Sequence, residues 1–219
     1  RVGARLFRAR LAADLGRHQE ALAEAEGALR EKVKEPKLLA EGHAARALSL
    51  TRLGRKAEAE ESLEKVDAFL ATIPRPLAEP KRMHLEGEIA LARGDHAAAR
   101  AALEKAARLA PMIGIRMDAG PIEIRYALAR TALEQDEPET AREHLRAVVD
   151  AGPARVMTPV PYVRSLALLA PLEEKAGKAA DARELYERYL GYWKDGQIDR
   201  AEVARAGQRL AALRPRPAA

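Results

Sequence analysis

A short turn recurs five times along the chain, and this repeat constrains the fold more than any other feature of the sequence. The turns are "LGRHQEA" at 15–21, "LGRKAEA" at 53–59, "RGDHAAA" at 93–99, "QDEPETA" at 135–141 and "AGKAADA" at 176–182. The residues in the same register of the turn are Gly16, Gly54, Gly94, Asp136 and Gly177, spaced 38 to 42 residues apart. A regular period of this length indicates a repeat architecture.

Small residues keep a fixed register on both sides of every turn. Seven residues before each turn position stand Ala9, Ala47, Gly87, Ala129 and Ala170, and five residues after it stand Ala21, Ala59, Ala99, Ala141 and Ala182. Glycine takes the left-handed conformation at low cost, so it can end one helix just before a second begins. Small side chains midway along both helices let the two backbones approach closely. Because one such pair cannot bury its apolar face alone, the sequence predicts stacked pairs.

We therefore expect an all-α solenoid of five helix pairs, in agreement with a composition rich in alanine, leucine, glutamate and arginine. The predicted pairs are 2–15 with 18–33, 37–53 with 56–72, 79–93 with 96–109, 121–135 with 138–151, and 161–176 with 179–194. A last helix at about 198–213 would cover the fifth pair as a cap. We expect a single domain over 1–213, with units at about 2–36, 37–75, 79–111, 121–153 and 161–196, and a flexible tail at 214–219. Pro171 predicts a bend near 167–171 or a later start of its helix.

The third unit, "HLEGEIALARGDHAAARAALEKAARLAP", carries a resemblance to a known family. Its Gly87, Gly94, Ala99, Ala106 and Pro111 fall where the tetratricopeptide repeat (TPR) motif places such residues. The resemblance covers residues 2–194. It implies a right-handed superhelix whose first helices line a concave groove that binds a protein or peptide.

The end of the repeat region carries a looser resemblance. Its residues Tyr186, Tyr189, Leu190, Trp193, Lys194 and Asp195 are similar to the end of TPR regions in bacterial multidomain signalling proteins, including those associated with serine/threonine kinases. The chain itself has no HRD or DFG motif of a kinase. Because it opens at Arg1 in a helical pattern, we interpret it as a fragment of a larger protein.

The inner-face positions that the TPR resemblance implies give the candidate groove residues. They are Arg10, Asp14, Glu41, Arg52, Lys81, His84, Glu88, Glu123, Tyr126, Arg130, Glu134, Arg164 and Lys175. Their charges are mixed, and a solvated face with ion pairs such as Arg10–Asp14 is the plain alternative. Chaperone C-terminus binding by an asparagine-containing carboxylate clamp is disfavoured, since the chain contains no asparagine.

Catalytic, metal and cofactor sites are not expected. There is no cysteine, and no histidine pair has HExxH spacing. The adjacent Asp95 and His96 could suggest half of a catalytic site, but His18 stands in the same turn position. We therefore predict a surface turn in which Asp95 caps the following helix.

Charge and hydropathy limit the partners. The net charge is +5, from 38 basic and 33 acidic residues, and the signs alternate along the chain, so no nucleic-acid partner is expected. No apolar stretch approaches the roughly 18 residues of a membrane span, so we expect no membrane insertion and a cytoplasmic location.

Two links between the predicted helix pairs, 111–121 and 152–162, are rich in apolar residues. These residues are Met112, Ile113, Ile115, Met117, Val156, Met157 and Val160. They are interpreted as wedges between repeats or, alternatively, as an adaptable ligand surface.

The predicted function is a non-enzymatic scaffold that binds a protein or peptide, as the interaction or sensory region of a larger bacterial signalling protein. The alternative is a self-association or intramolecular regulatory module for an attached kinase or transcription-factor domain, which could sense a small effector. A homodimer would use an aromatic surface of Tyr186, Tyr189, Tyr192 and Trp193.

Overall fold

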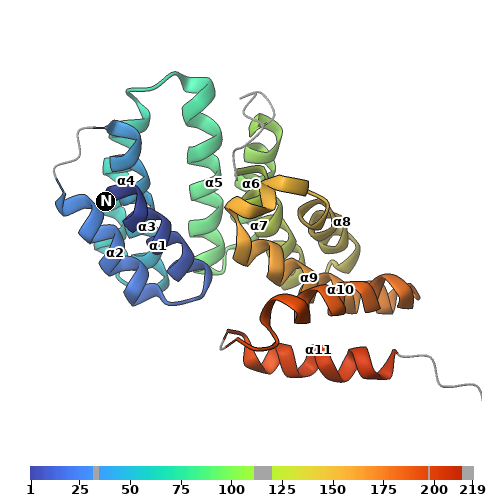
Figure 1. The fold of residues 1–219 in the computed structure, drawn as a ribbon. Helices are drawn as coiled ribbons and strands as arrows, with labels where there is room; N and C mark the ends of the chain where they lie inside the picture. The colour runs from blue at the N-terminus through green and yellow to red at the C-terminus, as the bar shows by residue number, and fades with distance from the viewer. Residues whose placement is uncertain (32–34, 111–119, 197, 214–219) are drawn as a thin grey trace, which may run out of the picture. The chain divides into compact units, whose positions relative to one another are not determined.

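The computed structural model describes residues 1–31, 35–110, 120–196 and 198–213. All regular structure in these ranges is helical (Figure 1). The α-helices are α1 (Val2–Asp14), α2 (His18–Arg30), α3 (Pro36–Arg52), α4 (Lys56–Leu70), α5 (Arg75–Arg93), α6 (His96–Leu109), α7 (Gly120–Glu134), α8 (Pro138–Val149), α9 (Pro159–Lys175), α10 (Ala179–Trp193) and α11 (Arg200–Ala212). A 3₁₀ helix, η2 (Gly152–Met157), precedes α9. The predicted all-α fold of helix pairs followed by a last helix is confirmed.

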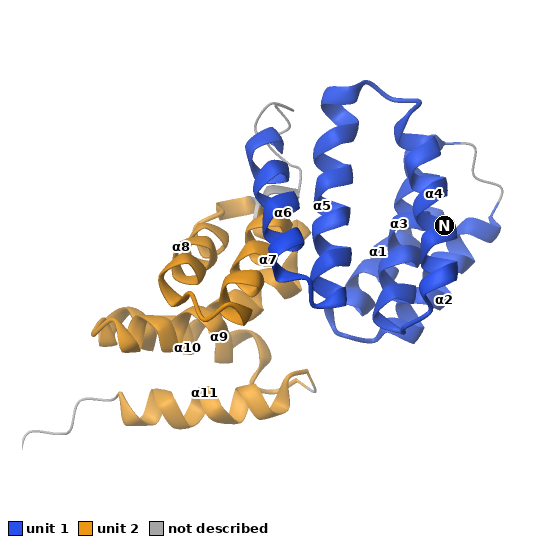
Figure 2. Ribbon diagram, turned by 180° about the vertical axis from the view of Figure 1, so that it is seen from behind, with its two compact units in different colours: residues 1–116 blue, residues 117–219 orange. Residues whose placement is uncertain are grey.

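The chain divides into two compact units, coloured separately in Figure 2. Unit 1 (Arg1–Arg116) contains α1 to α6, and unit 2 (Met117–Ala219) contains α7 to α11. In unit 1 the pairs α1–α2, α3–α4 and α5–α6 pack together, and α3 also contacts α1 and α5. In unit 2 the pairs are α7–α8 and α9–α10, and α9 also contacts α7. The expected single domain over 1–213 and its unit boundaries stay a prediction, and the expected tail at 214–219 lies outside the described residues.

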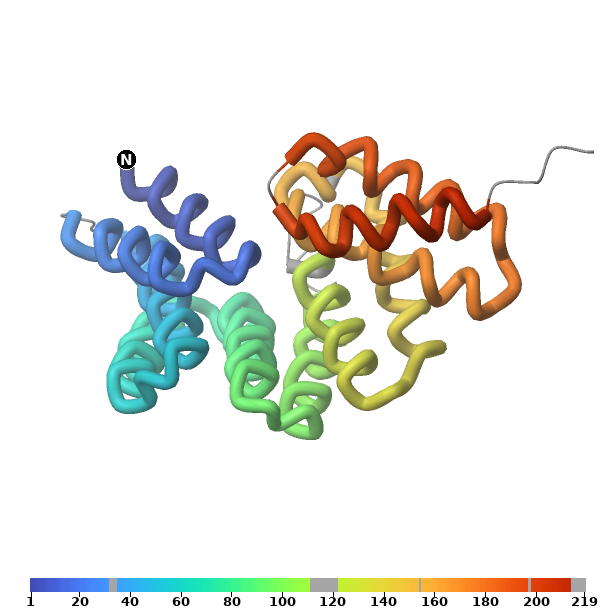
Figure 3. Tube along the Cα trace, turned by 90° about the horizontal axis from the view of Figure 1, so that it is seen from below, coloured from blue at the N-terminus to red at the C-terminus, as the bar shows by residue number. Residues whose placement is uncertain are grey.

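The five turns share one hydrogen-bonded geometry, and Figure 3 shows the short connection within each pair. The four turn glycines have φ between 74° and 78°, and Asp136 takes the same left-handed conformation at φ 56°. In each turn the next residue donates its backbone N–H to the carbonyl oxygen five residues earlier, as Arg17 does to Ala12 at 2.8 Å and Glu137 to Ala132 at 2.9 Å. This is the Schellman motif, which satisfies carbonyl groups that a helix end leaves open.

The small register residues lie where the paired helices meet. All ten of them are buried, and nine are alanines with no exposed surface. Gly87 shows how close the approach is, because a Cβ atom added there would lie 2.5 Å from Cγ of Leu103 and 3.3 Å from the carbonyl oxygen of Ala99. The α5–α6 pair therefore leaves no room for a methyl group at this position.

The last helix covers the end of unit 2, as the sequence predicts. Ala206 is buried, and Val203, Leu210 and Leu213 pack against the core formed by α7 to α10. The exposed residues of α11 are arginines, a glutamine and alanines, so the helix presents no large apolar side chain to water. An apolar flank of the fifth pair is thereby removed from water.

Two prolines lie inside helices that continue past them. Helix α9 runs without interruption from Pro159 to Lys175 although it contains Pro171, so the expected later start is wrong. Helix α5 contains Pro80 and begins at Arg75, before the expected start at 79. Each proline removes one backbone hydrogen bond. The buried side chains around Pro171, such as Leu169 and Leu172, hold α9 in its helical path by tertiary packing.

The two apolar links have different outcomes. Residues 111–119, with Met112, Ile113, Ile115 and Met117, lie outside the described residues. In the second link Val160 is buried, which agrees with a wedge between helices. Val156 is 73% exposed and Met157 is 44% exposed. The interpretation as wedges between repeats is therefore wrong for Val156 and Met157. Both lie at the end of η2, before the buried residues at the start of α9.

The close packing at Gly87 gives a first testable prediction. Replacing Gly87 by alanine should lower the free energy of unfolding by about 1–3 kcal/mol, because Leu103 must move to admit the methyl group. The control is Gly207→Ala in α11, where nothing lies within 4 Å of the added Cβ. That change should raise stability by about 0.5–1 kcal/mol. Urea unfolding followed by circular dichroism measures both, and a stabilising Gly87→Ala would contradict the packing argument.

The left-handed aspartate in the fourth turn gives a second prediction. Asp136→Gly should stabilise the protein by about 0.5 kcal/mol, because glycine relieves the steric cost of φ 56° and loses part of that gain through its freedom in the unfolded chain. The reciprocal change Gly177→Asp, at φ 75°, should destabilise it by a similar amount. Thermal unfolding of the two variants tests this, and a lower melting temperature for Asp136→Gly would be the contrary result.

Candidate functional site

The thirteen candidate groove residues all lie on the first helices of the pairs, and none of them is fully buried. In unit 1 they are Arg10 and Asp14 on α1, Glu41 and Arg52 on α3, and Lys81, His84 and Glu88 on α5. In unit 2 they are Glu123, Tyr126, Arg130 and Glu134 on α7, and Arg164 and Lys175 on α9. Because α3 touches α1 and α5, and α7 touches α9, the candidates of each unit stand on neighbouring helices. Their role in binding stays a prediction.

Two of the candidate arginines lie over aromatic rings of their own helices. The guanidinium carbon of Arg10 is 5.6 Å from the ring centre of Phe7, and that of Arg130 is 5.7 Å from the ring centre of Tyr126. Phe7 is 46% exposed, so α1 presents an apolar ring beside a cation. Such a pair of side chains suits contact with a peptide, since the ring adds apolar contact area and the positive charge orients the bound peptide. Phe7 is not among the residues predicted from the sequence, although its spacing of three from Arg10 places both on one helical face.

The charge of Arg52 acts on a histidine of the preceding helix. His18 begins α2, in the turn position that the sequence predicts. Partial burial and the nearby positive charge of Arg52 lower the pKa of His18 below its ordinary value. The imidazole is therefore neutral near pH 7, and the positive charge at this end of α3 comes from Arg52.

Arg164 makes an intramolecular ion pair that the sequence analysis did not foresee. Its Nε and Nη2 atoms donate to the two carboxylate oxygens of Asp199 at 2.8 and 2.9 Å. This two-pronged geometry is among the strongest for an arginine and a carboxylate. It joins α9 to the residue just before α11. Arg164 therefore positions the last helix, and the only sequence signal for Asp199 was an acidic residue before that helix.

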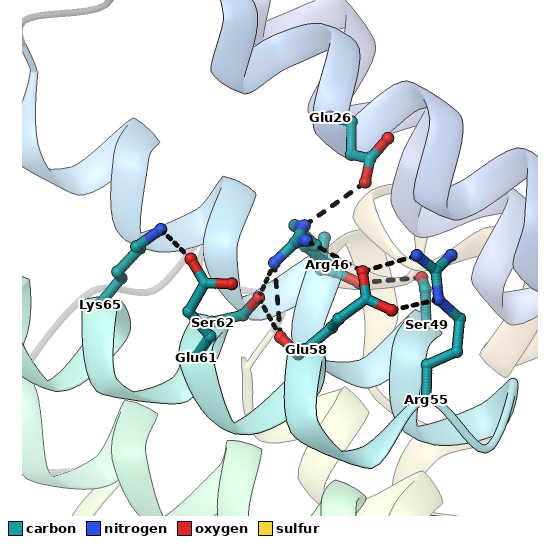
Figure 4. A network of polar contacts seen from close by, with 9 residues as sticks. Glu26, Arg46, Ser49, Arg55, Glu58, Glu61, Ser62 and Lys65 are labelled. Carbon is teal, nitrogen blue, oxygen red and sulfur yellow. Dashed lines mark hydrogen bonds and ion pairs between the residues drawn. The ribbon is translucent and has the colours of Figure 1, made fainter.

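Other conspicuous charges also hold helices together. The Arg46 side chain on α3 is only 15% exposed and lies between α2 and α4 (Figure 4). It donates to Oγ of Ser62 at 2.5 Å and to a carboxylate oxygen of Glu26 at 3.4 Å, and it pairs with Glu58 at 3.6 Å. These contacts tie three consecutive helices to one guanidinium. The Arg46 network is therefore structural.

Glu173 is a fully buried carboxylate in unit 2. Its Oε1 accepts from Arg146 of α8 at 2.5 Å, and Lys178 lies 3.8 Å from its Oε2. A buried carboxylate can be a general acid or base, but it needs access to a substrate. Glu173 has no exposed surface and is paired with two cations, which is the arrangement of a charge that joins helices.

The apparent Asp–His pair at 95–96 is a helix start. The N–H of Ala98 donates to Oδ1 of Asp95 at 3.0 Å, which confirms the predicted cap of α6. Within the described ranges, the structure holds no cluster of three or more histidine, aspartate or glutamate side chains that could bind a metal. Of the helices described, none combines the length and the apolar character that crossing a bilayer would require.

The C-terminal aromatic surface expected from the sequence is mostly absent. Tyr186 is 2% exposed and Tyr189 has no exposed surface, so the expectation that they are surface residues is wrong. The reason is that α10 packs between α9 and α11. Trp193 is partly buried, with its ring 5.7 Å from that of Tyr189. Tyr192 is 55% exposed and meets the ring of Tyr162 edge-on at 6.0 Å.

Comparison with known proteins identifies the repeat. A family model described as "Tetratricopeptide repeat" matches residues 2–26, 40–65, 83–105 and 123–147. A comparison with curated protein sequences gives no match.

Solved structures support the same fold. The chain resembles TTC0263, described as a thermophilic TPR protein of Thermus thermophilus, with 20% identity, a TM-score of 0.59, and coverage of 96% of this chain and 100% of that one. It is similar to pilF of Pseudomonas aeruginosa, with 16% identity, a TM-score of 0.57, and coverage of 97% and 88%. It is also similar to BtubC (BKLC) from P. vanneervenii, with 15% identity, a TM-score of 0.63, and coverage of 93% and 82%. Identities this low show the fold alone.

The family match and the structural geometry agree in detail. The matched segments contain the turns at Gly16, Gly54, Gly94 and Asp136 with the small residues that flank them. The fifth turn, at Gly177, lies outside the matched segments but has the same hydrogen bonds. The chain therefore carries tetratricopeptide repeats on an all-α fold of paired helices.

Proposed function

We propose that this chain is a non-enzymatic scaffold that binds a protein or peptide across its first helices. The observation that carries the proposal is the arrangement of accessible polar and aromatic side chains on neighbouring first helices of each unit. TPR proteins in general mediate protein–protein interactions, and the repeats of this chain are of that kind. A segment lying across successive helices would meet charges that set its orientation and rings that add contact area.

The second helices connect successive pairs within each unit. Within a unit, a second helix packs against the first helix of its own pair and of the next pair, as α2 does with α1 and α3 and α8 does with α7 and α9. Their alanines and leucines, such as Ala21 and Leu145, fill these contacts. The first helices of a unit also touch one another, so a segment lying across them would meet side chains of more than one pair. As a further part of the proposal, this scaffold is the interaction or sensory region of a larger bacterial signalling protein.

A charge-reversal experiment tests the groove in both units. Peptides of about 12 residues, long enough to cross two neighbouring helices when extended, are first selected from a random display library on the full chain. Lys81→Glu on α5 should weaken binding of the peptides that unit 1 selects, and Arg130→Glu on α7 those that unit 2 selects, each about ten-fold, because an attractive charge becomes repulsive. Fluorescence anisotropy with the labelled peptide measures the dissociation constants.

The matched controls reverse a charge on second helices. They are Arg108→Glu on α6 and Arg183→Glu on α10, both exposed and on the helices that the proposal leaves free of partner. These variants should bind the peptide like the parent chain. Equal weakening by control and groove variants would count against binding across the first helices.

Self-association is a second candidate, favoured by an exposed apolar surface in unit 2. Val156, Met157 and Tyr192 are the exposed large apolar residues in the described part of this unit. The ring of Tyr162 brings their segments together, since it contacts Tyr192 and lies 5.6 Å from the guanidinium carbon of Arg155. An exposed apolar patch of this kind can serve as a contact between copies.

Sedimentation velocity of the full chain tests this candidate. If the surface mediates a dimer, a double change Met157→Ser and Tyr192→Ser should convert the dimer to a monomer, because the apolar area that drives association is removed. The exposed Leu77→Ser in unit 1 is the control and should leave the dimer intact. A monomeric parent chain at all accessible concentrations would exclude the candidate.

A further inference from the structure

Unit 2 contains a hollow of about 430 Å³ between α7, α9, α10 and the start of α11. Among the residues that line it are Tyr126, Arg164, Tyr189, Asp199, Arg200 and Arg205. The apolar part of its wall comes from Ala167 and Leu168 of α9. The hollow therefore combines a small aliphatic wall with several charged groups.

Tyr189, one of the residues that line this hollow, carries an unpartnered hydroxyl. Tyr189 has no exposed surface, and its hydroxyl finds no hydrogen-bond partner among the described residues. Burial, with the negative charges of Asp199 and Glu202, raises the pKa of Tyr189 well above its usual value. The hydroxyl is thus a permanent donor without an acceptor, and buried polar groups are normally paired.

The start of α11 offers further donors. Asp199 precedes the helix with φ 50°, but its side chain does not cap the helix because both carboxylate oxygens accept from Arg164. The first backbone hydrogen bond of the helix runs from the N–H of Val203 to the carbonyl of Asp199. The N–H groups of Arg200, Ala201 and Glu202 precede it and lack acceptors within the helix. Such groups favour an anion.

The charges of the hollow do not cancel. Arg164 pairs with Asp199, and Arg205 pairs with Glu202 on the same helix. Among the residues that the structure describes, Arg200 makes no ion pair. Three arginines therefore stand against two carboxylates, and the balance is one positive charge. A monoanion matches this balance, whereas a phosphate with nearly two negative charges would be repelled by the two carboxylates.

We propose that the hollow binds the carboxylate of an acidic side chain, aspartate or glutamate, from the peptide or protein partner. This proposal rests on the proposed function and names the partner chemistry at one end of unit 2. The carboxylate accepts hydrogen bonds from the first N–H groups of α11, and Arg200 neutralises it. The Tyr189 hydroxyl, covered in the free protein, becomes a further donor when the side chains over it move aside on binding. An acidic side chain fits this proposal better than a chain end, because a segment that crosses α7 and α9 continues past the hollow.

A titration followed by nuclear magnetic resonance tests the proposal on the full chain. The protein carries ¹³C-labelled tyrosine rings and ¹⁵N-labelled amides. The probe is an end-capped alanine pentapeptide with a central glutamate, and the matched probe has glutamine in its place. Saturable shifts of Tyr189 and of the amides of Arg200 to Glu202 are expected with the glutamate peptide and not with the glutamine peptide.

Two variants connect the shifts to the donors. Tyr189→Phe should weaken binding of the glutamate peptide about ten-fold, the usual loss for a hydrogen bond to a charged group. Its melting temperature should be equal to or above that of the parent chain, because the lost hydroxyl has no partner among the described residues of the free protein. Arg200→Gln should weaken binding several-fold. Arg183→Gln removes an equal charge on the outer side of α10 and should have no effect.

Several results would overturn the proposal. They are equal binding of the glutamate and glutamine peptides, parent-like binding by Tyr189→Phe, and stronger binding of inorganic phosphate or of an alanine peptide with a free C-terminal carboxylate. If the glutamate peptide fails to bind while Lys81→Glu and Arg130→Glu still weaken the library-selected peptide, only this inference falls. If those variants also have no effect, the proposed function falls with it.

Discussion

The close approach of paired helices is the contact on which the rest of the structure depends. It needs a residue without a bulky side chain at one position of each helix, and all ten such positions are buried. At Gly87 even a methyl group would collide with Leu103. Because interiors are packed as densely as crystals, a larger residue there has to displace its neighbours. The spacing of these residues thus sets where each helix meets its partner.

Charged side chains in this protein act in two ways. Arg46 and Glu173 lie between helices and connect successive layers, and the ion pair of Arg164 with Asp199 fixes the start of the last helix. A second group, including Lys81 and Arg130, stands on the accessible side of the first helices. The function we propose draws on this second group, because these side chains are accessible on the first helices.

The hollow in unit 2 differs from the remainder of the first-helix surface. Here Tyr189 carries a buried hydroxyl without an acceptor among the described residues. The start of α11 lies in the same wall, and there Asp199 accepts from Arg164 and does not cap the helix. A buried donor without a hydrogen-bond partner lowers the stability of the folded protein, and a bound acceptor would restore that lost stability. The last helix is thus both a cover for the core and one wall of the binding site we propose.

The sequence by itself determined the repeat, the turn chemistry and the class of fold, because these follow from local backbone preferences and from spacing along one chain. Asp136 in its left-handed turn and Asp95 as a helix cap were both predictable on that basis. Only the tertiary structure decided which aromatic residues are buried, where Arg164 points and that the Tyr189 hydroxyl lacks a partner among the described residues. These outcomes depend on helices far apart in sequence, and a helical period alone does not say which neighbour covers a given face.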